Sequence, residues 1–182
     1  MTKAKVKKIH PFDRLDEWRV QVPTEINSRE MNTHIWMKGC SLDVENKPNG
    51  DFLGIGIYTP EVNKCYYWTD WKLAKQLIFK PFIAHAGAGD IGKLREWGFK
   101  VDESYLLYDT YLMEHIIDST QRDYSLTTLT KKYLGCYYPD FKEICGKDKS
   151  FADFAPELIA EKNFCDTYYT FKLMENQKCR MY

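Results

Sequence analysis

The sequence feature that most limits the fold is the stretch Ser41-Leu42-Asp43-Val44-Glu45, in which apolar residues alternate with acids. Successive side chains of an extended strand point to opposite faces, so Asp43 and Glu45 share one face while Leu42 and Val44 share the other. Two carboxylates on a buried face repel each other and lose their hydration, and only cations or hydrogen-bond donors compensate for that cost. Taken alone, the pattern is typical of a solvated edge strand. Its interpretation depends on which other residues reach the same place.

The composition indicates an ordered globular protein without a membrane segment. The 182 residues are enough for one domain with a sizeable core, and 44% of them are hydrophobic and 15% aromatic. The 26 basic residues balance the 26 acidic ones, so no overall charge attracts nucleic acid. The six cysteines form no CxxC pair, no apolar run approaches the ~20 residues of a membrane span, and no secretory signal is present. We therefore expect a soluble cytoplasmic protein in a reducing environment, with a nucleoid or a viral replication complex as alternatives, and no membrane partner.

The order of the expected elements indicates an α/β fold. Residues 1–36 are predicted to be an irregular N-terminal segment with one short strand at 18–22, and residues 37–182 one domain. Strands at 37–45, 52–58 and 64–68, joined by turns at 46–50 and 59–63, predict an antiparallel meander. The remaining predictions are helices at 71–78, 90–97, 109–118, 125–134 and 156–175, strands at 82–85 and 105–108, and loops at 86–89 and 136–152. This alternation predicts a mixed five-stranded sheet flanked by helices, with the strand of Asp43 at its centre.

Other acids are placed to reach the end of that central strand. Asp90 follows a strand and a glycine-containing loop, where open α/β sheets bring side chains to a ligand, although it is equally explained as an acid in a first helical turn. Asp166 shares a helix face with Ile159, Lys162 and Leu173 at spacings of three and four residues. An acid in the middle of such a face lies at the edge of the buried surface or belongs to a site.

Four carboxylates, on Asp43, Glu45, Asp90 and Asp166, predict oxygen ligands for two Mg²⁺ or Mn²⁺ ions. Two such ions activate a water and stabilise the leaving oxygen in a phosphoryl displacement. The sequence therefore predicts a metal-dependent phosphodiesterase. Asp109 begins a predicted helix and is better explained as its cap.

Four segments, in order, resemble the DnaQ-like (DEDD) 3′–5′ exonucleases over about residues 38–175. The stretch 41–45 resembles the first motif of that family, and Ile83-Ala84-His85 with the segment from Asp90 to Gly98 is similar to the second. The next segment is similar to the proofreading domains of family A DNA polymerases and to RNase D-like enzymes, through Tyr108-Asp109-Thr110 and Tyr124-Ser125-Leu126. Asp166, with Thr170 and Leu173 on the same helix, resembles the third motif.

The resemblance implies a ribonuclease H-like fold for the exonuclease domain 37–182, with the four acids as metal ligands and catalytic residues. It further implies that the enzyme removes nucleoside 5′-monophosphates from single-stranded DNA 3′ ends, in proofreading during DNA replication, beside a polymerase domain or subunit. Asn46 is expected to approach the terminal nucleotide. His85 is expected either to pack at a strand end or to lie near the substrate.

The sequence departs from the family's pattern at two places. Lys162 stands where the family places a tyrosine four residues before the last aspartate, Glu161 stands in place of a histidine five before it, and Ala86 replaces an asparagine. A protonated lysine has no acceptor for a proton from water. Lys162 is therefore expected to contact the scissile phosphate or offset the charge of the acids, or to act as a base if burial lowers its pKa. The departures predict reduced activity with metal binding retained.

Two alternatives stay open. One is a degenerate exonuclease fold that binds single strands or a partner protein without cutting, which Lys162 and Ala86 favour and the retention of four acids opposes. The other is an RNase D-like processor of RNA 3′ ends.

Overall fold

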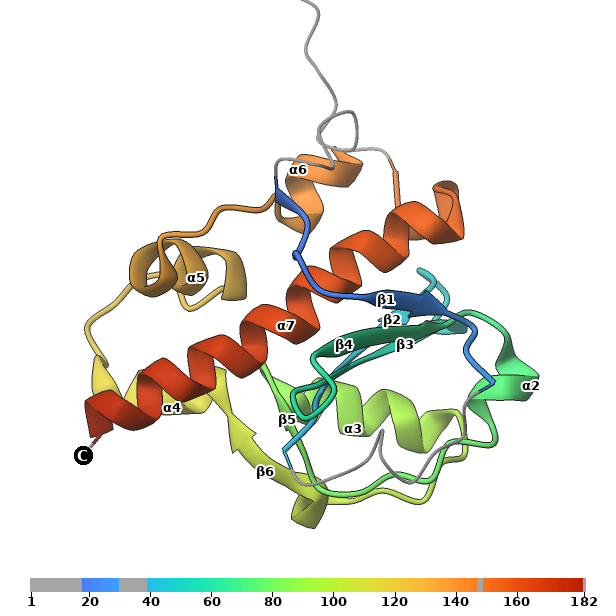
Figure 1. Cartoon of the computed structure of the whole chain (residues 1–182), viewed down its shortest axis with the longest axis horizontal. Coiled ribbons are helices and arrows are strands. Elements are labelled where there is room, and N and C mark those ends of the chain that lie inside the picture. The colour runs from blue at the N-terminus through green and yellow to red at the C-terminus, as the bar shows by residue number, and fades with distance from the viewer. Residues whose placement is uncertain (1–17, 30–38, 147–148, 182) are drawn as a thin grey trace, which may run out of the picture.

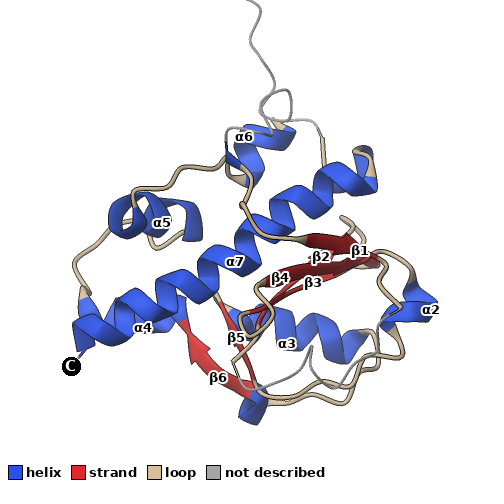
Figure 2. Ribbon diagram, in the orientation of Figure 1, coloured by secondary structure: helices blue, strands red, loops and turns tan. Residues whose placement is uncertain are grey.

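The computed structural model describes residues 18–29, 39–146 and 149–181, and a mixed sheet of six strands lies at its centre (Figures 1 and 2). The strand order is β1-β4-β3-β2-β5-β6. The strands are β1 Thr24–Ile26, β2 Ser41–Asn46, β3 Phe52–Thr59, β4 Lys64–Trp68, β5 Phe82–Ala84 and β6 Leu106–Asp109. The α/β fold with a mixed sheet is confirmed, and β2 lies inside the sheet as predicted, but the sheet has one strand more than the five expected.

The additional strand, β1, comes from the N-terminal segment that was predicted to be irregular. It pairs in parallel with β4, and the Pro23 carbonyl and the Asn27 N–H extend the ladder to Cys65 and Tyr67. The predicted strand at 18–22 is wrong, because Trp18 and Val20 are buried against α7 (Pro156–Met181) instead of pairing with a neighbouring strand. Most of the predicted segment 1–36, and the first two residues of the predicted strand 37–45, lie outside the described residues.

The helices cover both faces of the sheet. Figure 1 shows α7 running across one face while α3 lies on the opposite one, and the contacts of α7 with β2, β3, β4 and β5 agree with this placement. The other helices are α2 Trp71–Ala74, α3 Gly87–Glu96, α4 Thr110–Ile117, α5 Leu126–Leu134 and α6 Phe141–Cys145, with short 3₁₀ turns at Glu103–Tyr105 and Phe151–Asp153.

Several helix boundaries differ from the prediction for local reasons. The helix predicted at 71–78 ends at Ala74, because the chain turns to bury Leu77 and Phe79 in the core. The loop predicted at 86–89 is helical from Gly87 onward. The N–H groups at its start are capped by a residue distant in the sequence, since the carboxylate of Asp109 accepts hydrogen bonds from Ala86 and Gly87 at 3.0 Å each.

Two predicted caps have different outcomes. Asp109 caps α4 as predicted, accepting from the N–H groups of Tyr111 and Leu112 at 2.9 and 3.3 Å. Ser125 occupies the cap position of α5, but its side chain makes no capping hydrogen bond, and Asp123 binds its N–H instead.

The last two corrections concern the C-terminal third. The predicted loop 136–152 contains α6, which begins with a capping box formed by Asp140 and Glu143. Helix α7 extends to Met181 rather than to residue 175, because Gln177 and Arg180 hold its last turns against Glu114 of α4.

The two faces of the sheet bury different sets of side chains. Leu42, Ile55 and Ile57 form one core with Ile91 and Leu94 of α3. On the opposite face, residues of β3 and β4 pack against α7. Within the described part of the chain, no helix is long and apolar enough to cross a membrane.

Candidate active site

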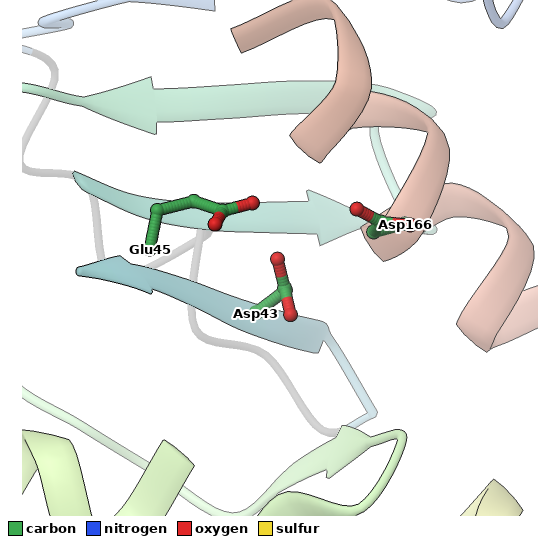
Figure 3. Close-up of side chains that lie close together, drawn as sticks. All are labelled: Asp43, Glu45 and Asp166. Carbon is green, nitrogen blue, oxygen red and sulfur yellow. The ribbon is translucent and has the colours of Figure 1, made fainter. Parts of the chain in front are cut away.

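Three of the predicted acids come together where β2 meets α7. Asp43 and Glu45 point from β2 toward Asp166 on α7, and an oxygen of each carboxylate lies within 4.8 Å of the other two (Figure 3). The alternation along β2 places both acids on the face that α7 covers, which is the arrangement predicted from residues 41–45.

Gly56 in β3 lets α7 approach the acids closely, whereas the space over Gly54 is filled by Tyr67 of β4. Gly56 pairs with Asp43 and Gly54 with Glu45, so the two glycines share the acids' face of the sheet. A Cβ on Gly56 would lie 1.4 Å from Oδ1 of Asn163, whose Nδ2 donates to Asp43 Oδ2 at 2.7 Å. Asn163 was not predicted as a site residue. The Gly-x-Gly pattern opposite Asp-x-Glu was the available signal.

Asp90 reaches β2 from the other helix. Strands β2 and β5 pair only at Ser41 and Ile83. Further along β2, the backbone N–H of Val44 donates to the Asp90 carboxylate. Asp90 is 9% exposed, and its Oδ2 has no hydrogen-bond partner among the described residues. It lies close enough to Asp43 for their charges to interact, but it is not one of the three acids within 4.8 Å of one another.

Burial and mutual repulsion disfavour the charged forms of these acids. Burial raises the pKa of Asp43 to about 8, with Asp166 adding to the increase and Lys162 opposing it. The pKa values of Glu45 and Asp90 are also raised, first by burial and then by the charge of Asp43. Such a group gains free energy when a cation binds, because the cation replaces the lost hydration.

Lys162 supplies a positive charge at the same place. Its Nζ donates to both oxygens of Asp166, at 2.5 and 2.6 Å, and the residue is only 6% exposed. Burial lowers the pKa of Lys162, but Asp166, Glu45 and Asp43 outweigh it and the pKa is raised. This direction supports charge compensation and opposes a role as a base.

Tyr138 is a further residue of the site that was not among the predicted site residues. Its O–H donates to Asp166 Oδ1 at 3.0 Å, its ring lies beneath Lys162 with Nζ 4.8 Å from the centroid, and it is fully buried. It precedes α6 in the segment predicted to be a loop, where no periodicity relates it to α7. The capping box that starts at Asp140 was the nearest signal of local order.

His85 and Asn46 lie outside this acidic group. His85 Nδ1 is 2.8 Å from Thr110 Oγ1, and its ring packs edge-on against Tyr111. Burial lowers its pKa, although Asp109 and Asp166 oppose that effect, so neutral imidazole is favoured. Asn46 is exposed at the end of β2, and its amide donates to the carbonyl of Lys47 at 2.8 Å.

The donors in this group fit a divalent cation. Carboxylate oxygens are hard ligands that suit Mg²⁺ and Mn²⁺, and oxygens on one Mg²⁺ lie roughly 3–4 Å apart because each is about 2 Å from the ion. Small side-chain rotations therefore bring Asp43, Glu45 and Asp166 into coordinating range. The unpartnered Oδ2 of Asp90 is a further oxygen that lacks a compensating donor.

Comparisons with known proteins identify the fold. No family model matches the sequence, and no curated protein matches it. NrnC from Brucella melitensis superposes with a TM-score of 0.67 and 14% identity over 88% of this chain and 81% of NrnC. Structures of NrnC bound to pGG and with bound Mg²⁺ give TM-scores of 0.66 and 0.62 at 13% and 15% identity.

Two larger proteins contain the same fold as one part. Escherichia coli RNase D, an exoribonuclease involved in structured RNA processing, superposes with a TM-score of 0.58 at 16% identity over 86% of this chain and 45% of RNase D. Pol1 from M. smegmatis, in complex with DNA primer-template and dNTP, gives 0.64 at 11% identity over 87% of this chain and 27% of Pol1. The chain thus has the ribonuclease H-like fold of the DnaQ-like 3′–5′ exonucleases.

Proposed function

We propose that this protein is a divalent-metal-dependent 3′–5′ exonuclease. The observation that carries the proposal is the meeting of Asp43, Glu45 and Asp166 within 4.8 Å, in a fold shared with RNase D and NrnC. A partly buried group of carboxylates costs folding free energy, and a bound cation is the compensation that the donor set fits.

Each residue of the site has a role that follows from its position. Asp43, Glu45, Asp90 and Asp166 hold Mg²⁺ or Mn²⁺, and Asn163 keeps Asp43 oriented through the 2.7 Å hydrogen bond. When bound, the metal lowers the pKa of a coordinated water and stabilises negative charge on the leaving oxygen. Lys162 adds a fixed positive charge beside the position of the scissile phosphate.

The substrate that we propose is a single-stranded DNA 3′ end, in proofreading with a polymerase domain or subunit. The superposition on part of Pol1 supports this assignment. RNA is the alternative substrate, supported by the superpositions on RNase D and on NrnC bound to pGG. Asn46, exposed at the end of β2, and His85 are the proposed substrate-binding residues, outside the acidic group itself.

The second candidate function is single-strand binding without cleavage. It is favoured by the pairing of Lys162 with both oxygens of Asp166, because an internal cation satisfies that carboxylate without a metal. A protein of this class binds single strands equally well with and without divalent ions.

The test uses single-stranded DNA and RNA of the same sequence, each labelled at the 5′ end. Each strand is incubated with the protein in Mg²⁺, in Mn²⁺ and in chelator. We expect a ladder of 3′-shortened products that disappears with chelator and in Asp43→Asn. Glu61→Gln, which makes the same chemical change on an exposed turn, is the control and is expected to leave the ladder intact.

The outcomes separate the candidates. Faster shortening of RNA than of DNA would replace DNA by RNA as the substrate. No shortening in either metal, with strand binding retained, would overturn the exonuclease and support the binding function.

A further inference from the structure

The carboxylate of Asp166 is already occupied by groups of the chain itself. Lys162 Nζ donates to both of its oxygens, at 2.5 and 2.6 Å, and Tyr138 O–H donates to Oδ1 at 3.0 Å. Three charge-assisted hydrogen bonds on two oxygens use most of the lone pairs that a metal ion would need. Any cation that approaches Asp166 must compete with an ammonium bound on both oxygens.

The ammonium is also enclosed on its other side. Lys162 lies inside α7, facing the sheet, with Nζ 4.8 Å above the ring centroid of Tyr138. Tyr138 has no exposed surface and stacks on Tyr169 with centroids 5.2 Å apart. A charge held between a carboxylate and an aromatic face is stabilised by both, and a rotation away from Asp166 would leave that charge buried without its partner.

The net charge of the site also favours one cation over two. A metal ion binds the ionised forms of these acids. In that state the four carboxylates, on Asp43, Glu45, Asp90 and Asp166, together with protonated Lys162 carry three negative charges before the charge of the ion is counted. One divalent cation reduces this to a single negative charge, whereas a second would leave a positive charge in a buried place. The second cation is therefore opposed both by the occupied oxygens of Asp166 and by the net charge.

We propose that the site takes one divalent cation, and that the ammonium of Lys162 is the fixed second positive charge in place of a second metal ion. This inference rests on the proposed exonuclease function and differs from the two ions that the sequence resemblance implies. This ion is held mainly by Asp43 and Glu45, with the unpartnered Oδ2 of Asp90 as a further oxygen. Asp166, proposed above as a fourth ligand, then acts mainly by holding the ammonium of Lys162.

The experiment counts bound ions without using activity. Mn²⁺ is titrated calorimetrically into the purified full-length protein, with and without a nucleoside 5′-monophosphate, and the bound ions are examined by electron paramagnetic resonance. Two Mn²⁺ ions roughly 4 Å apart give the broadened spectrum of a coupled pair, whereas a single ion does not. We expect one uncoupled Mn²⁺ per chain, and two coupled ions in Lys162→Met.

Matched variants isolate the contribution of the ammonium. Lys172→Met removes a lysine from the same helix, where it pairs with Glu175 at the surface, and is expected to bind one ion. Tyr138→Phe keeps the ring beneath Lys162 but loses the hydroxyl, and is also expected to bind one. Circular dichroism verifies folding, and Lys162→Gln serves if Lys162→Met does not fold.

Several results would overturn the inference. Two ions in the unmodified protein, or one ion in both Lys162 variants, would show that Lys162 does not set the number of ions. Two ions in Tyr138→Phe would assign the exclusion to the hydroxyl instead. Two ions together with 3′ shortening would overturn this inference alone, whereas no bound ion and no shortening would overturn the exonuclease as well.

Discussion

The two faces of β2 are built from neighbouring residues but stabilised in opposite ways. Leu42, 1% exposed, points into an apolar core that includes Ile55 and Ile91. The next residue, Asp43, points into a group of carboxylates beneath α7. Each buried leucine contributes about 1.5–3 kcal/mol to folding, whereas each buried carboxylate raises the free energy of the folded state unless a cation accompanies it.

The difference shows how the chain compensates for an acidic face. Two of the compensating groups come from one helix, since Lys162 binds Asp166 and Asn163 binds Asp43, and Tyr138 before α6 adds a hydrogen bond to Asp166. Helix α3, on the other face, contributes a single acid to the site and otherwise packs through Ile91 and Leu94. Along β2, the side chains that face α7 are therefore arranged for binding and those that face α3 for stability.

Replacing Asp43 on the side of β2 that faces α7 is expected to have the largest effect, a loss of nuclease activity. Asp43→Asn keeps the hydrogen bond from Asn163 but removes a metal ligand. The rate of 3′ shortening should therefore fall by more than the ~100-fold that is typical when a residue hydrogen-bonded to a metal ligand is replaced. The rate is measured on labelled strands at saturating Mg²⁺. A loss of less than about tenfold would contradict a ligand role for Asp43.

Replacing Leu42, on the side of β2 that faces α3, is expected to lower the stability of the fold. Leu42→Ala leaves a cavity in the apolar core and should cost about 2–5 kcal/mol in the free energy of unfolding, measured by urea denaturation. In chelator at pH above about 8, where the Asp43 carboxyl is ionised, Asp43→Asn should instead stabilise the protein, because it removes a poorly hydrated charge. If both variants destabilise the metal-free protein to the same extent, the contrast between the two faces is wrong.

Much of this contrast could be predicted from sequence. The alternation of residues 41–45 and the spacing of Lys162 and Asp166 on a helix are local patterns. They predicted a central strand and the meeting of four acids, three of which lie within 4.8 Å of one another. Local patterns succeed there because strand and helix periodicity decide which side chains share a face.

The features that were missed depend on partners distant in the sequence. Strand β1 forms because β4 offers an open edge, and residues 24–26 carry no alternation that identifies a strand. Tyr138 reaches Asp166 from a segment without periodicity. The replacement of the expected tyrosine by Lys162 was visible in the sequence, but its contact with both Asp166 oxygens required the structure.

The pH dependence of stability tests the electrostatic cost of the acidic side chains directly. The folded-state pKa values of Asp43, Glu45 and Asp90 are raised, so these acids favour the folded state at low pH, and their contribution is lost as the pH rises from about 4 toward about 8, the pKa of Asp43. We expect the metal-free protein to lose at least about 3 kcal/mol between pH 5 and pH 8, because each pKa unit of the shift corresponds to about 1.4 kcal/mol. Thermal unfolding in chelator measures this change.

Metal and mutation provide the controls for that pH dependence. Saturating Mg²⁺ should remove most of the decrease, because the ion stabilises the ionised acids, and Asp43→Asn should reduce it in chelator. Surface acids whose pKa is lowered, such as Asp118 and Asp123, lose their contribution only as the pH falls below about 4, outside this window. Stability that increases from pH 5 to pH 8 in chelator would contradict the account of the acidic face.

The smallest expected effect concerns backbone strain on the α3 side. Ala86 precedes α3 with φ of 59° and ψ of 41°, a left-handed conformation that costs an alanine roughly 1–2 kcal/mol. Asparagine tolerates this conformation and is a favoured residue at helix N-termini, so Ala86→Asn should stabilise the protein by about 1 kcal/mol. Urea denaturation measures the gain. Ala88→Asn is the control, because Ala88 lies in the first turn of α3 and does not have a positive φ. Because Asp109 already binds the N–H groups of Ala86 and Gly87, the gain comes from relieved strain rather than from a new cap. A stability unchanged by Ala86→Asn would mean that the strain is relaxed elsewhere, and the α3 face would then owe its stability to apolar burial alone.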